Sequence, residues 1–177
     1  MRRLGRTGGS HMPITPTGTV VRHGDAAELV LERRVGHDAI AVWPYLAESR
    51  ELSTWFGAYV GDPDSGEVVL AMTAEEGDAT QAVEILDCDA PEHLAVLTTD
   101  EHGSWSLEVE LVDGGHETGS GTTIRFTHHD VPAASVPDIA AGWEWYLDRL
   151  VAALAGQPMP DWDDYYPALR DAYRGSD

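Results

Sequence analysis

The chain has 177 residues, of which 42% are hydrophobic, and its 31 acidic against 11 basic residues give a formal net charge of −20. This length favours one domain with a sizeable core, and no apolar run approaches the roughly 20 residues that a membrane-spanning helix needs. So acidic a surface repels phosphate backbones and anionic lipid, which makes a nucleic acid or a membrane an unexpected partner. A protein partner bound through the acidic surface is compatible with this charge.

The two ends of the chain are set apart from the expected domain. Residues 1–12 end in Gly-Gly-Ser-His-Met and resemble an expression-vector scar, so we exclude them from the fold. They lack the apolar core of a secretory signal, and the single Cys88 cannot form an internal disulfide. Both observations favour the reducing cytoplasm. We expect one domain over residues 13–157, followed by an acidic extension over residues 158–177 that holds a short helix.

The domain is predicted to open with two strands and two short helices. Residues 19–35 alternate apolar and polar side chains around one break, as in strands with one solvated face. Helical spacing of apolar residues predicts a short helix around residues 40–46, which His37 or Asp38 can cap. A second short helix is expected over residues 49–56.

From Gly57 onward, short alternating runs separated by turn residues indicate an antiparallel meander. We predict its strands at residues 58–60, 68–73, 81–87, 93–99, 104–112 and 122–129. Trp105 and Val109 share the apolar face of the fifth of these strands, and Phe126 and His128 share that of the sixth. A single covering element could bury all of these faces.

That element is predicted as one long amphipathic helix over residues 137–156. Trp143 and Leu147 belong to an apolar stripe that recurs every three or four residues and turns toward the sheet. Glu144 and Trp145 fall off this stripe, so we expect them away from the buried face. The helix would run roughly 30 Å, the width of a small domain.

This order of elements describes a helix-grip fold of the α+β class, in which a curved antiparallel sheet wraps around a long C-terminal helix and two short helices follow the first strand. Five parts of the sequence, in this order and at this spacing, also resemble the motifs of a known family: Trp43 and residues 52–57, 83–94, 121–128 and 142–150. Together they resemble the activator of heat-shock protein 90 ATPase homologue family, within the START-like or SRPBCC superfamily. The resemblance covers about residues 27–156.

The resemblance implies a deep cavity between the helix and the sheet, which the superfamily uses for apolar or amphipathic small molecules. From the residues alone, two aromatic faces either pack solidly or leave a pocket, and periodicity does not decide which. The candidate ligand-binding residues are the side chains expected on these faces and near the cavity mouth: Trp43, Trp55, Phe56, Trp105, Val109, Phe126, His128, Trp143, Tyr146 and Leu147.

His128 is the candidate polar group of the pocket. Facing inward, its imidazole could hydrogen-bond a ligand or act as a base, with Asp130 or Tyr146 as a partner. The alternative is a strand-end histidine in water or bonded to the backbone. His116, His128 and His129 crowd one hairpin but lack the spacing of a zinc site. We therefore assign no catalytic residue and expect neither a metal nor a cofactor.

The sequence thus predicts a single domain that binds a hydrophobic or aromatic small molecule. Two alternatives stay open. One is a co-chaperone-like regulator of a heat-shock ATPase, against which the lack of a recognisable second domain counts. The other is a cyclase, dehydratase or hydrolase acting on a polyketide-like substrate. Either a monomer or a homodimer fits the sequence.

Overall fold

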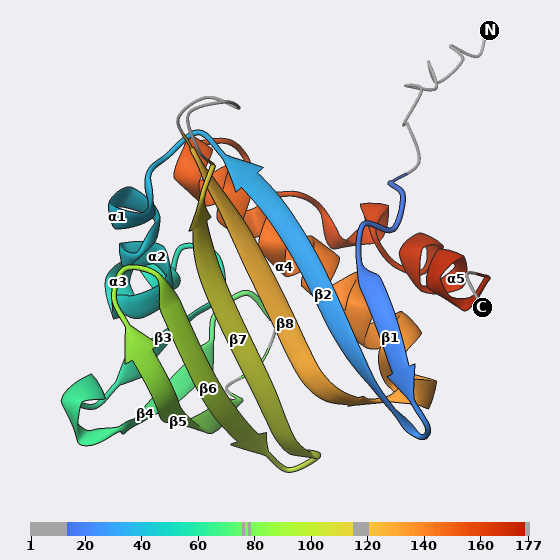
Figure 1. The fold of residues 1–177 in the computed structure, drawn as a ribbon, viewed down its shortest axis with the longest axis horizontal. Helices are drawn as coiled ribbons and strands as arrows, with labels where there is room; N and C mark the ends of the chain where they lie inside the picture. The colour runs from blue at the N-terminus through green and yellow to red at the C-terminus, as the bar shows by residue number, and fades with distance from the viewer. Residues whose placement is uncertain (1–13, 76, 78, 115–120, 176–177) are drawn as a thin grey trace, which may run out of the picture.

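An open eight-stranded antiparallel sheet forms the body of the computed structural model, which describes residues 14–75, 77, 79–114 and 121–175 (Figure 1). The strand order is β1-β2-β8-β7-β6-β5-β4-β3, which leaves β1 and β3 as the two edges. The strands are β1 (Thr19–His23), β2 (Ala26–Val35), β3 (Gly57–Val60), β4 (Glu67–Met72), β5 (Thr80–Asp89), β6 (His93–Asp100), β7 (Gly103–Asp113) and β8 (Thr122–Pro132). Together with the long helix below, this confirms the α+β helix-grip architecture.

Three short helices, rather than two, connect β2 to β3. They are α1 (Ala39–Val42), α2 (Pro44–Ala47) and α3 (Ser49–Leu52). Asp38 caps α1 by accepting the Ala41 N–H at 2.8 Å, and Pro44, which has no N–H, starts a separate helix. The expected second helix ends at residue 52, short of residue 56. Ser49 donates its hydroxyl to the Tyr59 carbonyl at 2.7 Å, which ties α3 to β3.

The long helix α4 (Val136–Ala155) covers one face of the sheet and lies behind β2 and β8 in Figure 1. Pro137 stands in its first turn, and Gly156 ends it in the left-handed region at φ 62°. The side chains of Trp143 and Leu147 lie on the buried face of this helix, as their spacing predicted. Neither α4 nor any other described helix is both long and apolar enough to cross a membrane.

The other side of α4 is covered by the C-terminal extension, which contains the 3-10 turn η3 (Trp162–Asp164) and helix α5 (Ala168–Arg174). The prediction that Trp145 lies away from buried surface is therefore wrong, since its side chain is only 9% exposed. Its indole N–H donates to the Pro160 carbonyl at 3.1 Å, and its ring packs against Trp162. Leu169 of α5 is fully buried in the main core.

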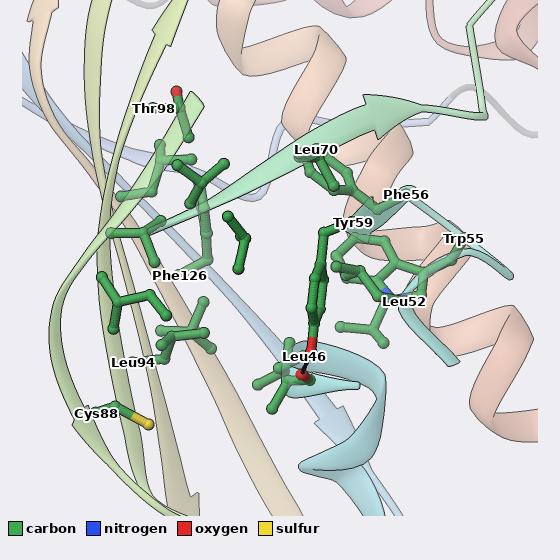
Figure 2. Close-up of a pocket in the computed structure, with 18 of the residues that line it drawn as sticks. Leu46, Leu52, Trp55, Phe56, Tyr59, Leu70, Cys88, Leu94, Thr98 and Phe126 are labelled. Atoms are coloured by element: carbon green, nitrogen blue, oxygen red, sulfur yellow. Dashed lines mark hydrogen bonds between the residues drawn. The ribbon is translucent and has the colours of Figure 1, made fainter. Parts of the chain in front are cut away.

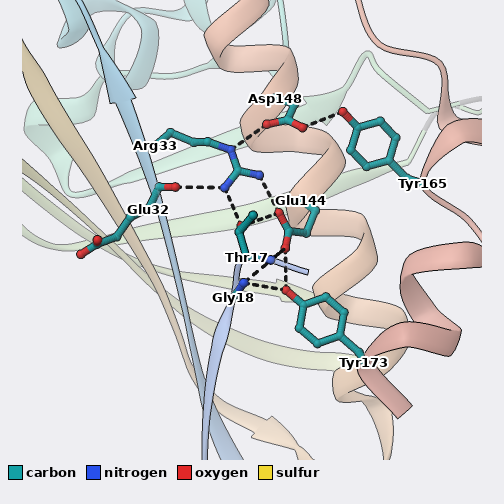
Figure 3. A network of polar contacts seen from close by, with 8 residues as sticks. All are labelled: Thr17, Gly18, Glu32, Arg33, Glu144, Asp148, Tyr165 and Tyr173. Carbon is teal, nitrogen blue, oxygen red and sulfur yellow. Dashed lines mark hydrogen bonds and ion pairs between the residues drawn. The ribbon is translucent and has the colours of Figure 1, made fainter. Parts of the chain in front are cut away.

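A polar network on this side of the sheet fastens α4 to β2 (Figure 3). Arg33, on the inner face of β2, makes ion pairs of 2.6 Å with both Glu144 and Asp148 of α4. Tyr173 and Tyr165 donate to these same two carboxylates, each at 2.6 Å. Burial alone would raise the pKa of Glu144, but hydrogen bonds from Tyr173, Thr17 and Arg33 outweigh it and hold that pKa below its usual value.

The segment before β1 closes the network by a close backbone approach. The Gly18 N–H donates to the Tyr173 hydroxyl at 2.8 Å. A Cβ at position 18 would lie 2.5 Å from that hydroxyl, so a larger residue here would have to displace Tyr173 from the network. The network thus holds the N-terminal segment, β2 and α5 against one side of α4.

Candidate functional site

An apolar cavity of about 180 Å³ lies on the opposite side of α4, between this helix, strands β3 to β8 and the short helices (Figure 2). We call it the inner cavity. Its wall is formed by Leu46, Ala47, Leu52, Trp55, Phe56, Tyr59, Pro63, Val68, Leu70, Val83, Ile85, Cys88, Leu94, Val96, Thr98, Leu107, Val109, Ile124, Phe126, Trp143, Leu147 and Leu150. None of these side chains carries a formal charge at neutral pH.

Two aromatic wall residues, Trp55 and Tyr59, bond through their polar atoms to backbone carbonyls of α2. Trp55 donates its indole N–H to the Tyr45 carbonyl at 2.9 Å, and Tyr59 donates its hydroxyl to the Ala47 carbonyl at 2.7 Å. Both hydrogen bonds fix α2 against the residues that follow α3. They also satisfy the indole N–H of Trp55 and the hydroxyl of Tyr59 without a ligand, so these two side chains present apolar surface to the cavity.

A second, larger space of about 690 Å³ adjoins the inner cavity, and we call it the outer cavity. The two share four wall residues, Phe56, Thr98, Leu107 and Trp143. The outer cavity is further lined by aromatic, small and acidic side chains from β4 to β7, their loops and α4: Met72, Glu75, Ala79, Thr80, Gln81, Asp100, Glu101, His102, Trp105, Asp138, Ile139, Gly142 and Tyr146. An apolar chamber thus borders an acidic one.

The structure brings eight of the ten predicted site residues to these two cavities. Trp55, Phe56, Val109, Phe126, Trp143 and Leu147 line the inner cavity, and Trp105 and Tyr146 line the outer one together with Phe56 and Trp143. Trp43 and His128 line neither. Trp43 is half-buried where α1 meets α2.

His128 is buried in a cluster of aromatic rings. Its side chain continues the inward face of β8, as its spacing predicted, and is 3% exposed. Nδ1 accepts the Trp143 indole N–H at 3.1 Å, and the imidazole stacks on Trp105 with centroids 4.9 Å apart. An indole can only donate, so Nδ1 is unprotonated here. Burial, with a smaller effect of neighbouring His129, lowers the pKa of His128 to about 4.

The residues considered for acid–base chemistry do not converge. Tyr146 donates its hydroxyl to Glu75 at 2.5 Å in the outer cavity, and burial followed by this hydrogen bond raises the Tyr146 pKa. Asp130 is exposed and has a positive φ of 55°. His128 uses Nδ1 to hold Trp143 and faces neither cavity. This arrangement makes His128 a support for the cavity wall.

The outer face of the sheet carries a row of histidine–carboxylate contacts. Glu108 of β7 bonds His93 at 2.7 Å with one oxygen and His129 at 2.8 Å with the other. The hydrogen bond to Glu108 raises the pKa of His93. Burial would lower the pKa of His129, but the hydrogen bonds to Glu108 and Glu28 outweigh burial, and the pKa of His129 is raised. No cluster suited to a metal ion occurs within the described ranges. His116, included in the metal hypothesis, lies outside them.

Many wall residues of the two cavities were missed by sequence reasoning, and three of them show why. Thr98 shares the inner face of β6 with Leu94 and Val96, so strand alternation could have found it. Cys88 reaches the inner cavity because a bulge around Leu86 shifts the register of β5, and nothing in the sequence marks that bulge. Glu75 lies in a loop, where periodicity carries no information.

Comparisons with known proteins agree with this architecture. CalU16 from Micromonospora echinospora is 20% identical with a TM-score of 0.70, covering 89% of this chain and 95% of its own. The protein encoded by BPP1335 from Bordetella parapertussis is 24% identical, with a TM-score of 0.66 over 90% and 89% of the two chains. DynU16, a protein of the dynemicin biosynthetic locus, is 19% identical with a TM-score of 0.63 over 76% of this chain and 49% of its own.

At these identities the solved structures show a shared START-like fold. No curated protein matches the sequence. The family model for activator of Hsp90 ATPase homolog 1-like protein matches residues 37–155, which hold the short helices, most of the sheet and α4. Because that match covers more than half of the chain, this protein belongs to the activator of Hsp90 ATPase homolog 1-like family of the SRPBCC superfamily.

Proposed function

We propose that this protein binds an apolar or aromatic small molecule in the inner cavity. The observation that carries the proposal is an uncharged cavity of about 180 Å³ beneath α4, in a fold whose helix and sheet could have packed together without one. An engineered apolar cavity of about 150 Å³ is known to stay dry and to bind benzene. A ligand of one or two rings is therefore of suitable size.

The cost of leaving the cavity empty supports the same conclusion. An apolar void costs about 24 cal/mol per Å³, so about 180 Å³ corresponds to about 4 kcal/mol of stability forgone. A protein is stable by only about 5–15 kcal/mol, so this is a substantial fraction. A bound ligand would recover part of it by restoring dispersion contacts with the wall.

The wall chemistry selects the kind of ligand. Trp55 and Tyr59 donate their polar hydrogens to backbone carbonyls. Phe56 and Trp143 stack with ring centroids 5.9 Å apart and add apolar surface to the wall. Away from Thr98, a polar ligand group in this chamber would lose its hydrogen bonds to water without replacement. Flat, weakly polar ring systems fit best, and the rings of a polyketide-like molecule fall within this class.

The proposal is tested with the uncharged two-ring dye 6-propionyl-2-(dimethylamino)naphthalene, whose emission shifts to shorter wavelength in apolar surroundings. We expect saturable binding to the wild-type protein. Val109→Phe, which places a ring inside the cavity, should weaken binding at least about tenfold while the protein stays folded. The matched control is Val112→Phe, an exposed position on the same strand, which should bind as the wild type does. Absence of saturable binding, or equal binding by Val109→Phe, would refute the proposal.

The two alternative functions have less support in the geometry. A cyclase, dehydratase or hydrolase would need an acid or base facing the ligand, yet His128 is neutral, buried and bonded to Trp143. A co-chaperone-like role is suggested by the family description, and no contact surface among the described residues favours it. Ligand binding is therefore the function that we propose.

A further inference from the structure

The outer cavity differs from the inner one in charge. Four of its described wall residues are carboxylates, Glu75, Asp100, Glu101 and Asp138, and none is an arginine. We propose that the outer cavity holds the protonated amine of a ligand whose apolar body occupies the inner cavity. This inference rests on the proposed function and narrows it to amphipathic amines.

Glu75 is the best-placed of these carboxylates. It accepts the Tyr146 hydroxyl at 2.5 Å, and among the described residues it has no other hydrogen-bond partner. A carboxylate offers about four lone-pair positions, so most of the acceptor capacity of Glu75 remains for a ligand. Asp138, in contrast, already accepts the Tyr166 hydroxyl at 2.9 Å and lies 4.0 Å from Arg174.

The aromatic wall of the outer cavity suits a cation as well. Phe56, Trp105, Trp143 and Tyr146 all line it, and the faces of such rings attract ammonium groups. Aromatic side chains combined with carboxylates are how proteins commonly recognise organic cations. An anionic ligand would meet both the carboxylates and the negative ring faces, so the same wall disfavours it.

Thr98 gives a second, independent indication of a ligand. Its side chain is 6% exposed, lines both cavities and makes no hydrogen bond to any described residue. Lining both cavities places it at their boundary, and its pairing partner on β7 is Trp105 of the outer cavity. Figure 2 shows Thr98 at one end of the inner-cavity wall. The Thr98 hydroxyl therefore has acceptor capacity left for an ammonium N–H of a ligand.

Arg149, an arginine close to Tyr146, is already engaged elsewhere. Arg149 follows Tyr146 by one turn of α4, but its Nε donates to the Trp55 carbonyl at 2.8 Å and its guanidinium lies 4.7 Å from the Trp145 ring centroid. It does not line the outer cavity. Glu75 is therefore not neutralised by an ion pair with Arg149.

Three probes of similar shape test the inference by calorimetric titration: 2-(1-naphthyl)ethylamine, 2-(1-naphthyl)ethanol and 1-naphthylacetate. We expect the amine to bind about tenfold more tightly than the alcohol at low salt, and the acetate more weakly than either. Glu75→Gln keeps an acceptor for Tyr146 and should remove most of the preference for the amine without changing the affinity for the alcohol. Glu84→Gln, an exposed acid on β5 outside both cavities, is the matched control and should keep the preference.

The outcomes separate this inference from the function on which it rests. If the alcohol binds as tightly as the amine, the inner cavity binds ligands and the amine site is refuted. If Glu75→Gln and Glu84→Gln reduce the preference equally, the preference reflects the net charge of the protein, and the amine site is again refuted. If none of the three probes binds, both proposals fail.

Discussion

Acid should destabilise this protein through His128, because the native state keeps that imidazole neutral. Its pKa falls from the ordinary 6.5 to about 4 through burial. Below about pH 6.5, His128 is protonated in the unfolded chain but stays neutral in the native state. The free energy of unfolding therefore falls progressively as the pH drops from about 6.5 to the native pKa. Between about pH 7 and pH 4.5 the loss from this one group amounts to about 2 kcal/mol.

Urea denaturation at these two pH values, on the wild type and on His128→Asn, measures the effect. Asparagine places a carbonyl near the position of Nδ1, so Trp143 keeps an acceptor, but no group titrates. We expect the variant to be less stable at neutral pH, because the stacking on Trp105 is lost, and to lose about 2 kcal/mol less than the wild type on acidification.

The control is His102→Asn, whose side chain is 77% exposed in the wild type and which should follow the wild-type pH dependence. Histidines on the outer face contribute with the opposite sign, but they are present in all three proteins and cancel in the comparison. Parallel pH dependences for wild type and His128→Asn would refute the buried neutral imidazole.

Three further predictions concern the surroundings of the cavities. Arg33→Leu leaves the carboxylate of Glu144, which is 1% exposed, without its cation and should lower the free energy of unfolding by about 3–5 kcal/mol in urea denaturation. Arg125→Leu, at an exposed ion pair, is the control and should change the free energy of unfolding far less. Equal costs would contradict the buried network. Leu169→Ala should cost about 2–5 kcal/mol in the same assay, because this fully buried side chain anchors α5, and a negligible cost would show that α5 is not docked. Glu108→Gln should bring the raised pKa values of His93 and His129 back toward 6.5 in an NMR titration, and unchanged pKa values would exclude the pairing. The stability that these two pairs give is present below pH 6.5 and is lost as the pH rises through the raised pKa values.

The sheet and the long helix were predictable because their signals are local. Alternation of apolar and polar residues marks each strand, and the stripe through Trp143 and Leu147 marks the buried face of α4. The cavity-facing positions of β7 and β8 follow from the same alternation, which is why Val109 and Phe126 were identified. Val109, Phe126, Trp143 and Leu147 line the inner cavity for this reason.

The remaining features depend on contacts between distant segments. Glu144 and Trp145 were placed on an open face of α4, because periodicity along one helix cannot show that residues 158–175 return to cover it. Aromatic residues of the extension such as Tyr165 and Tyr173 were the only local hint. The acidic outer cavity likewise combines a loop, a turn and α4, so no single stretch of sequence displays it.

The asymmetry around α4 explains why a cavity survives in this core. Among the strands, β2 makes the most extensive backbone contacts with α4, and Arg33 fixes that side through two ion pairs. The inner cavity lies on the other side and shares no residue with the Arg33 network. Sites without common partners contribute additively to stability. The increase in melting temperature that a ligand produces should therefore persist in variants of the network that still fold, whereas substitutions of the cavity wall should reduce it.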